Sequence, residues 1–371
     1  MNEVAVAVVF QRRTPYVDAR LAALRSHLQS TKVNAIAIYG DSEPSPWWND
    51  PSKLDEWKLT GDNWKAALPG VLRADTMRVV AICGYSHPAM RAAARLARAD
   101  GTRTILMSDS THLGRSRHPV KEWLKRRWVS KHFDAAFVSG ARAAFYVESL
   151  GIPRQRVWRG YDVVDNAHFA DGAERARQKA TEHRQAMGLP ERFFLFVGRF
   201  AEEKNLFRLL DAYAAYRSRA RAGAWDLVMV GTGPLGQELK QRASALNLEG
   251  LLWAGSKMAD ELPVYYGLGT AIILPSTRES WGLSINEAMA CGLPVLASDQ
   301  CGSVPDLVFP GINGMVFDPR DSDQIADAMT RLSSGDVDLA AMGEASRRLV
   351  ANHTTQTWAE ALGDCINSVA G

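Results

Sequence analysis

The chain contains the stretch Arg278-Glu279-Ser280-Trp281-Gly282-Leu283-Ser284-Ile285-Asn286-Glu287. It follows the apolar run Ala271–Leu274, which is typical of a buried strand, and it runs into a helix predicted over Ser284–Cys291. A loop that closes on a helix N-terminus offers backbone N–H groups and the positive end of the helix dipole to a phosphate. The carboxylates on either side suit the hydroxyls of a sugar and of a ribose. The stretch therefore predicts a site for a sugar nucleotide.

Apolar runs alternate with helical patterns on both sides of this stretch, which predicts an α/β fold with doubly wound parallel sheets. Residues 165–192 are polar and poor in apolar periodicity, so we expect a domain boundary there. The predicted domains are 1–170 and 171–352, followed by a terminal segment, 353–371, whose helix we expect to pack back on the first domain. Ligands of such sheets bind beyond the carboxyl ends of the strands, so two facing domains would put the site in the cleft between them.

The predicted strands are short apolar runs, six in each half. They are Val4–Phe10, Ala35–Tyr39, Val79–Cys83, Thr104–Met107, Ala135–Val138 and Val157–Tyr161, then Phe193–Val197, Leu227–Val230, Leu251–Ala254, Ala271–Leu274, Val295–Ala297 and Met315–Phe317.

Composition excludes several classes of protein. The chain has 371 residues, 46% of them hydrophobic, which is enough for two cores. No apolar run approaches the roughly 20 residues that cross a bilayer, and Val4–Phe10 has neither the basic flank nor the cleavage site of a signal peptide. The four cysteines show no pair spacing, so we expect neither a zinc site nor disulfides and predict a reducing cytoplasm.

Charge is distributed unevenly along the chain. Residues 1–170 carry 25 Lys and Arg against 16 Asp and Glu, a net +9, whereas residues 171–371 are net −6. The segment 115–132 is the most basic, and Trp123, Leu124, Trp128 and Val129 suggest one apolar stripe on its helix. This segment is either an ordinary core helix with a solvated face or a surface that lies on an anionic membrane. No nucleic-acid partner is predicted.

A second motif, Gly198-Arg199-Phe200-Ala201-Glu202-Glu203-Lys204-Asn205, follows the first strand of the second half. Arg199 and Lys204 can hold a diphosphate and neutralise the charge of a departing nucleotide, as a divalent metal does elsewhere. The alternative is a pair of surface cations, with Lys204 paired to Glu202 or Glu203. Because Glu279 follows a later strand of the same sheet, we favour the functional interpretation.

The glycine loop Gly231-Thr232-Gly233-Pro234-Leu235-Gly236 fits the pattern of dinucleotide-binding loops. It follows the second strand of its half rather than the first, and Pro234 suits helix position N1, so the glycines alternatively serve a tight turn. No acidic residue ends the next strand, where Lys257 stands instead. We therefore expect Gly231 and Gly233 to approach a nucleotide sugar rather than a nicotinamide or flavin.

Other polar clusters can also be explained by a purely structural role. Glu287 completes a capping box, S-x-x-E, with Ser284 as N-cap. The acidic pairs Asp321/Asp323 and Asp336/Asp338 are typical of helix caps, so no metal site is predicted. In the first half, Asp109 follows a strand and either binds an acceptor hydroxyl or belongs to a capped turn, as does His112.

At this point two stretches resemble the donor domain of glycosyltransferase family 4. They are Gly198-Arg199-Phe200 with Glu203-Lys204-Asn205, and Glu279-Ser280-Trp281-Gly282-Leu283 running on to Glu287-Ala288-Met289-Ala290-Cys291-Gly292-Leu293-Pro294-Val295. The resemblance covers about residues 190–330. It implies the GT-B fold, with two Rossmann-like domains around a cleft, and metal-independent transfer that retains anomeric configuration. Trp281 stands where the family usually has Phe, and Asp109 lies near the position of a His in many members.

The resemblance also implies roles for individual residues. Arg199 and Lys204 would hold the donor diphosphate, and Glu279 would bind donor-sugar hydroxyls. The amides of Trp281, Gly282 and Leu283 would bind sugar and phosphates, and Glu287 the ribose hydroxyls. Gly198, Gly231, Gly233 and Lys257 complete the expected donor site, and Asp109 is the catalytic candidate of the first half.

These observations together predict a hexosyltransferase that needs no cofactor or metal. It would move a sugar from a nucleotide-sugar donor to the hydroxyl of a glycan or lipid-linked acceptor, in polysaccharide or glycolipid biosynthesis. We expect it in the cytoplasm, on the inner face of the plasma membrane. Two alternatives stay open: a sugar-nucleotide epimerase of the same fold, and a catalytically silent nucleotide-binding scaffold.

Overall fold

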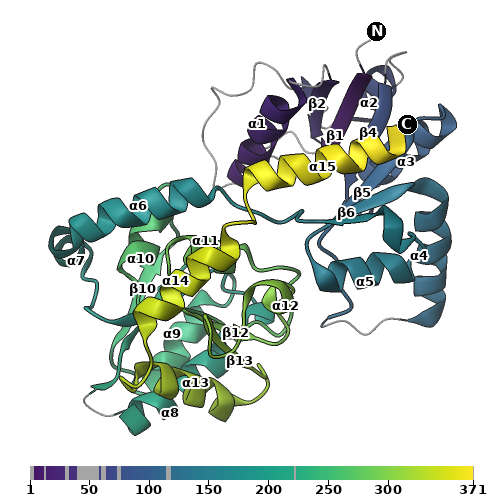
Figure 1. Cartoon of the computed structure of the whole chain (residues 1–371). Coiled ribbons are helices and arrows are strands. Elements are labelled where there is room, and N and C mark those ends of the chain that lie inside the picture. The colour runs from purple at the N-terminus through teal and green to yellow at the C-terminus, as the bar shows by residue number, and fades with distance from the viewer. Residues whose placement is uncertain are drawn as a thin grey trace. The chain divides into compact units, whose positions relative to one another are not determined.

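The computed structural model describes residues 4–11, 14–29, 33–39, 58–59, 64–72, 77–113, 118–220 and 223–370 (Figure 1). Its chain divides into two compact units. Unit 1 comprises Met1–His112, Ser116–Val164 and His353–Gly371, and unit 2 comprises Leu113–Arg115 and Asp165–Asn352. Each unit is built around its own parallel β-sheet.

The sheet of unit 1 has the strand order β3-β2-β1-β4-β5-β6-β7, and every described pair in it is parallel. Its strands are β1 (Val4–Phe10), β2 (Val33–Tyr39), β3 (Lys58–Leu59), β4 (Met77–Cys83), β5 (Arg103–Ser108), β6 (Ala135–Val138) and β7 (Val157–Arg159). The helices are α1 (Pro15–Gln29), α2 (Trp64–Leu72), α3 (Pro88–Ala99), α4 (Pro119–His132), α5 (Ala141–Ser149), the short 3-10 helix η3 (Arg154–Arg156) and α15 (Thr355–Ala370).

Helices cover both faces of this sheet, because its central strands are apolar on both sides. One core cluster joins alternate residues of β1 and β4 to the buried faces of α2, α3, α4 and α5. The other joins the remaining alternate residues to α1 and to the last helix, α15, which places Trp358, Leu362 and Ile366 against the sheet. The two ends of the chain therefore build one face of unit 1 together (Figure 1).

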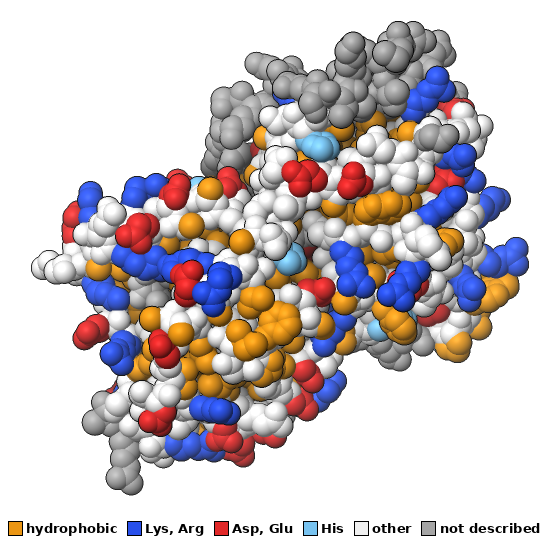
Figure 2. Space-filling view, viewed as in Figure 1, with side chains coloured by type: hydrophobic (Ala, Val, Ile, Leu, Met, Phe, Trp, Pro, Cys, Tyr) orange, Lys and Arg blue, Asp and Glu red, His pale blue; other side chains and the backbone are white. Residues whose placement is uncertain are grey.

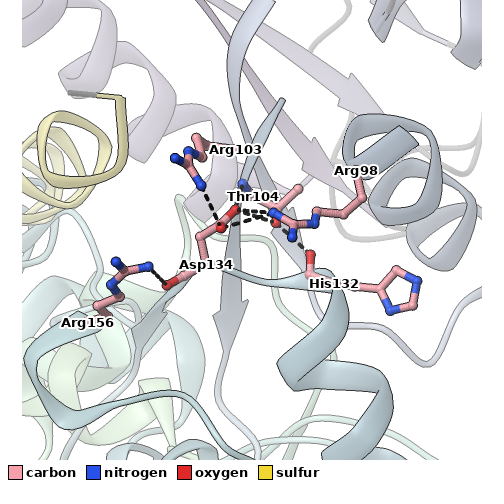
Figure 3. Close-up of polar contacts among 6 residues, drawn as sticks. All are labelled: Arg98, Arg103, Thr104, His132, Asp134 and Arg156. Atoms are coloured by element: carbon pink, nitrogen blue, oxygen red, sulfur yellow. Dashed lines mark hydrogen bonds and ion pairs between the residues drawn. The ribbon is translucent and has the colours of Figure 1, made fainter. Parts of the chain in front are cut away.

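Asp134 ties the amino-terminal ends of β5, β6 and β7 together (Figure 3). Its carboxylate accepts hydrogen bonds from Arg98 at 3.0 Å, from Arg103 at 3.3 Å and from the backbone N–H of Thr104 at 2.9 Å. Its carbonyl accepts one from Arg156 at 3.3 Å. Because these strands are parallel, one residue in front of the middle strand reaches the start of both neighbours.

The sheet of unit 2 has the strand order β10-β9-β8-β11-β12-β13, again parallel throughout its described pairs. Its strands are β8 (Phe193–Val197), β9 (Asp226–Val230), β10 (Leu251–Gly255), β11 (Ala271–Leu274), β12 (Val295–Ser298) and β13 (Gly314–Phe317). Its helices are α6 (Asn166–Gln178), α7 (Ala180–Met187), η4 (Glu202–Lys204), α8 (Leu206–Ala220), α9 (Gly236–Ala245), α10 (Leu262–Leu268), α11 (Leu283–Ala290), α12 (Val304–Leu307), α13 (Ser322–Ser333) and α14 (Leu339–Val350).

This strand order fixes where unit 2 can hold a ligand. The chain builds outward from β8 in one direction, through β9 and β10, and then returns to build β11, β12 and β13 on the other side. The loops that leave β8 and β11 therefore diverge beyond the carboxyl ends of two adjacent strands. In open α/β sheets this topological switch point is the ligand-binding position.

The segment 165–192, where we expected the domain boundary, is largely helical. It folds as α6 and α7, and α6 buries Phe169, Ala173 and Ala176 at helical spacing. The signal was weak because two of the three buried residues are alanines, which contribute little hydrophobic periodicity. Both helices belong to unit 2, whose boundary falls between Val164 and Asp165.

Candidate functional site

Lys204 and Glu279 meet at the switch point of unit 2. Lys204 ends the short helix that follows β8, and Glu279 lies in the loop that follows β11. The Lys204 ammonium donates to Glu279 Oε2, and Ser276 donates to the same carboxylate at 3.2 Å. Each charged side chain is 17% exposed, so the pair is largely buried but still reaches solvent. The bland alternatives for Lys204, pairing with Glu202 or Glu203, are wrong.

Asn205 holds the Lys204 loop in place. Its backbone is in the left-handed region, with φ of 59°, which Asn tolerates better than most residues. Its side-chain amide donates to the carbonyls of Pro275 at 3.1 Å and Pro319 at 2.7 Å. The loop after β8 is thereby fixed to the loop after β11, and the position of Lys204 relative to Glu279 follows from it.

Arg199 lies beside this pair but is far more exposed, at 64% of its side chain. Its guanidinium donates to Glu203 at 2.9 Å. Burial acts to raise the pKa of Glu203, but a backbone N–H bond and the charges of Arg199 and Lys204 outweigh it and lower the pKa overall. Glu203 therefore stays ionised and restrains Arg199 next to the site, a partner that the sequence did not identify.

The glycine loop after β9 packs directly on the loop after β8. A Cβ on Gly231 would lie 1.9 Å from the carbonyl oxygen of Gly198, and one on Gly233 would lie 2.4 Å from that of Phe200. Gly231 also has φ of 137°, which side-chain-bearing residues rarely adopt. The placement of Pro234 at helix position N1 is wrong, since α9 begins at Gly236. The glycines thus serve a close approach between two loops that border the site.

The loop from Glu279 to Gly282 is fixed by a segment that the sequence did not reveal. Glu279 pairs with Cys301 as an isolated bridge, and Ser303 N–H donates to the Trp281 carbonyl at 3.1 Å. A Cβ on Gly302 would lie 1.7 Å from the Ser280 carbonyl oxygen. These small residues follow β12, some twenty positions away from the loop in sequence. No pattern in the sequence around the loop indicates that they contact it.

Gly282 sets the start of α11. Its φ of 100° places it in the left-handed region as the N-cap, and the helix begins at Leu283. Trp281 is buried in front of it and donates its indole N–H to Asn286 Oδ1 at 2.9 Å. The Ile285 N–H donates to the Gly282 carbonyl at 2.9 Å. The first N–H groups of a helix generally have no acceptor within it, so this terminus offers donors to an anion.

Glu287 does not take part in the capping box that the sequence predicted. Because α11 begins at Leu283, Ser284 is inside the helix and cannot be its N-cap. The Glu287 side chain is buried instead, with 2% of the residue exposed, and its Oε2 accepts a hydrogen bond from the hydroxyl of Tyr266. The capping-box explanation for this carboxylate is therefore wrong.

Lys257 lies in the loop between β10 and α10. Its ammonium is 5.6 Å from the centroid of the Tyr265 ring and 3.9 Å from Glu261. The Lys257 side chain is partly buried. It follows β10, which lies on the same side of the switch point as β8.

Asp109 follows β5 in unit 1, beside a buried polar cluster at the carboxyl ends of its strands. Cys83 Sγ lies 2.9 Å from the Tyr161 hydroxyl, and the Arg20 guanidinium lies over the Tyr161 ring at 5.3 Å. Burial raises the pKa of the Cys83 thiol to about 11, and the charges of Asp109 and Asp162 act in the same direction. The Cys83 thiol is therefore neutral. Asp109, which is half-buried, lies beside this cluster.

The expected apolar stripe of α4 is divided between two faces. Val129 is buried and Trp128 half-buried, whereas Trp123 and Leu124 are each 54% exposed. The expectation of a single stripe is therefore wrong. Arg115 and Arg117, the first cations of the predicted basic segment, lie outside the described residues.

The remaining predictions concern caps and cysteines. Asp321 accepts from the N–H groups of Asp323 and Gln324, and Asp338 accepts from that of Ala341, so both acids are N-caps as predicted. The four cysteines are free. Within the described residues, no helix has the length and apolar character that crossing a bilayer requires.

Residues 179–349 match the family described as glycosyl transferases group 1. Among curated proteins, the chain is 30% identical over 234 residues to the alpha-D-kanosaminyltransferase of Streptomyces kanamyceticus, covering 62% of this chain and 59% of that protein. It is 31% identical over 263 residues to a GDP-mannose-dependent alpha-(1-6)-phosphatidylinositol monomannoside mannosyltransferase of Mycolicibacterium smegmatis, covering 68% and 66%. The chain thus spans less than two thirds of each of these two relatives.

Solved structures agree on the fold. The Anabaena protein Alr3699/HepE, solved in complex with UDP and glucose, superposes with a TM-score of 0.75 at 14% identity, covering 99% of this chain and 100% of that one. Residues 179–349 therefore form a glycosyl transferases group 1 domain, and the chain has the GT-B fold, with two Rossmann-like parallel-sheet units, as predicted.

Proposed function

We propose that this protein is a retaining, metal-independent hexosyltransferase of glycosyltransferase family 4, which transfers a sugar from a nucleotide-sugar donor to an acceptor hydroxyl. The observation that carries the proposal is the Lys204–Glu279 pair at the switch point of a group 1 domain. A cation and a carboxylate in contact at this position suit the two parts of a sugar diphosphate. The cation complements the charge of the phosphate, and the carboxylate accepts hydrogen bonds from the sugar hydroxyls.

In this mechanism the donor diphosphate binds Lys204 and Arg199, and the sugar hydroxyls bind Glu279. The acceptor oxygen attacks the anomeric carbon on the face from which the phosphate leaves, so the configuration is retained. The bond from that carbon to the phosphate oxygen breaks as the new glycosidic bond forms, and the acceptor proton passes to the departing phosphate. The N-terminus of α11 and the two cations stabilise the charge that develops there.

The other assigned residues complete the donor and acceptor sides. The amides of Trp281, Gly282 and Leu283 would bind the phosphates, and Glu287 the ribose hydroxyls. Lys257 would border the nucleotide, with Gly198, Gly231 and Gly233 shaping the loops beneath it. In unit 1, Asp109 would bind the acceptor hydroxyl. No metal is required, because protein cations supply the positive charge.

The comparisons guide the choice of donor and acceptor. The M. smegmatis relative uses GDP-mannose and acts on a phosphatidylinositol mannoside, and the Anabaena protein was solved with UDP and glucose. We therefore propose glycolipid or polysaccharide biosynthesis in the cytoplasm as the setting. The deciding experiment incubates the enzyme with UDP- and GDP-hexoses, with and without a membrane extract, and measures nucleotide release.

The expected result is release that depends on the extract, that survives EDTA, and that yields a product with the anomeric configuration of the donor. Conversion of the donor without extract would favour the epimerase, and binding without turnover would favour the silent scaffold. Inversion, or loss of activity in EDTA that added metal restores, would contradict the corresponding part of the proposal.

We further propose that unit 1 docks on an anionic membrane through α4 and α5. Large hydrophobic side chains are exposed there: Val120 (57%), Trp123 (54%) and Leu124 (54%) on α4, and Phe145 (67%) on α5. The two helices are joined at this place, since the Tyr146 hydroxyl donates to Glu122 at 3.1 Å. Hydrophobic and basic side chains lie together in Figure 2 along the edge that α4 occupies in Figure 1.

The charge of α4 matches the headgroups of such a membrane. The helix carries five basic residues against the single acid Glu122, which is already paired with Lys125 at 2.6 Å. The five are Lys121, Lys125, Arg126, Arg127 and Lys131. Each cation near an anionic bilayer contributes about 1 kcal/mol, and partly inserted aromatic and aliphatic side chains add to this.

Sedimentation with phosphatidylglycerol-containing vesicles tests this surface. We expect Trp123→Ser/Leu124→Ser to weaken binding about tenfold or more, and salt to weaken it further. The control is Phe309→Ser/Ile312→Ser, which removes two exposed hydrophobics of unit 2 and should bind like the wild type. A wild-type protein that stays off these vesicles at low salt would contradict the proposal.

A further inference from the structure

Tyr266 and Glu287 form a buried pair behind the donor site of unit 2. Tyr266 is fully buried and Glu287 is 2% exposed. The tyrosine hydroxyl donates to Glu287 Oε2. This hydrogen bond satisfies a buried hydroxyl and one oxygen of a buried carboxyl group. Because it engages one named oxygen, it also restricts rotation of the carboxylate.

The ring of Tyr266 is itself held rigidly. It contacts Phe169 of α6 edge-to-face, with the ring centroids 5.8 Å apart. Next to it, Gly267 packs so closely on α6 that a Cβ there would lie 2.7 Å from the Ala173 carbonyl oxygen. In the same contact between α6 and α10, a Cβ on Gly172 of α6 would lie 2.5 Å from Pro263 of α10. Helix α10 therefore has little freedom to carry the tyrosine away.

The helix that carries Glu287 is fixed at its C-terminal end as well. Arg177 of α6 and Arg347 of α14 both donate to the carbonyl of Cys291, the C-cap of α11. Cations at this end also complement the helix dipole. The backbone of α11 is thus located by its neighbours, and the Tyr266 hydroxyl is one of the contacts that orient the Glu287 carboxylate.

We infer that Tyr266 is a positioning residue that aims the Glu287 carboxylate at the ribose of the donor nucleotide. The inference rests on the proposed role of Glu287 in ribose binding and deepens it. Without the phenol, one oxygen of the carboxyl group loses a buried donor, and its orientation is less restrained. Nucleotides would then still bind through their phosphates, but the ribose hydroxyls would contribute less.

The test measures the affinity of the full-length protein for UDP and GDP and for their 2′,3′-dideoxy counterparts. The ratio of the two affinities isolates the contribution of the ribose hydroxyls. We expect Tyr266→Phe, which keeps the ring and its contact with Phe169, to lower this ratio about tenfold. The control is Tyr213→Phe, since Tyr213 is also fully buried in unit 2 but its hydroxyl donates to the Gly250 carbonyl at 2.8 Å. That variant should lose some thermal stability and keep the wild-type ratio.

A third variant, Glu287→Ala, separates the inference from the function beneath it. If Glu287→Ala lowers the ratio and Tyr266→Phe does not, the positioning role is wrong and the ribose assignment stands. If Glu287→Ala keeps the wild-type ratio, the ribose assignment itself is wrong and the positioning role falls with it. A drop in both variants but not in Tyr213→Phe supports the inference.

Discussion

Lys204 and Glu279 neutralise each other in the structure, and this contact has consequences for ligand binding. A diphosphate that binds Lys204 competes with the carboxylate, while a sugar hydroxyl that binds Glu279 competes with the ammonium. A complete donor can satisfy both groups at once, whereas a free nucleotide satisfies only the cation. Under the proposed function, we therefore expect the pair to favour the intact nucleotide sugar over the nucleotide that remains after transfer.

This arrangement predicts opposite effects of two substitutions on the binding of free nucleotide. Lys204→Ala should weaken UDP or GDP binding, whereas Glu279→Ala should leave it unchanged or strengthen it, because the competing carboxylate is gone. Both should lower transfer at least tenfold, and about a hundredfold where the full ~3 kcal/mol of one charge-stabilising contact is lost from the barrier. Calorimetry and initial rates measure the two quantities. Equal weakening of nucleotide binding in both variants, or wild-type rates in both, would contradict the assignment.

The matched control is Arg242→Ala, which breaks an exposed ion pair with Asp211 in the same unit. Exposed pairs contribute only about 0–1 kcal/mol to stability. We expect this variant to fold, to bind nucleotide and to turn over like the wild type. A similar loss in the control would mean that the two site variants act through stability.

At the level of single residues, the sequence indicated which candidate residues lie close together where a residue type and its place after a strand were both informative. This held for Lys204 and Glu279, which follow β8 and β11 and meet in space. It failed for Ser284, because the left-handed backbone of Gly282 starts the helix two residues earlier than a capping box with Ser284 as N-cap requires. Gly302 was not predicted, since its close contact with Ser280 joins segments far apart in sequence.

At the level of elements, apolar runs predicted strands well and amphipathic patterns predicted helices less well. Buried parallel strands are apolar on both faces, so β8 and β11 were predicted with the bounds that they have. Helix α6 was not predicted because alanines form much of its buried face, and the stripe of α4 was misassigned because this helix exposes part of its apolar surface. Composition alone does not say which apolar side chains find a partner.

At the level of the whole molecule, the last helix stabilises the first unit. Helix α15 follows unit 2 in sequence, yet it contributes Trp358, Leu362 and Ile366 to a core that it shares with α1 and the strands of unit 1. An amphipathic helix fits any complementary apolar surface, so its own sequence does not identify the unit that it joins. We therefore expect the stability of unit 1 to depend on residues 353–371.

Trp358→Ala tests this dependence. Truncating a fully buried tryptophan typically costs about 3–5 kcal/mol, and here we expect the loss in unit 1 only. Hydrogen exchange should show lost protection in α1 and β4, while β8 and β11 keep theirs. The control is Met329→Ala, which truncates a fully buried side chain of α13 and should affect unit 2 instead. If Trp358→Ala lowered protection in unit 2 as much as in unit 1, the two units would not be separate cores, and the assignment of α15 to the first would be wrong.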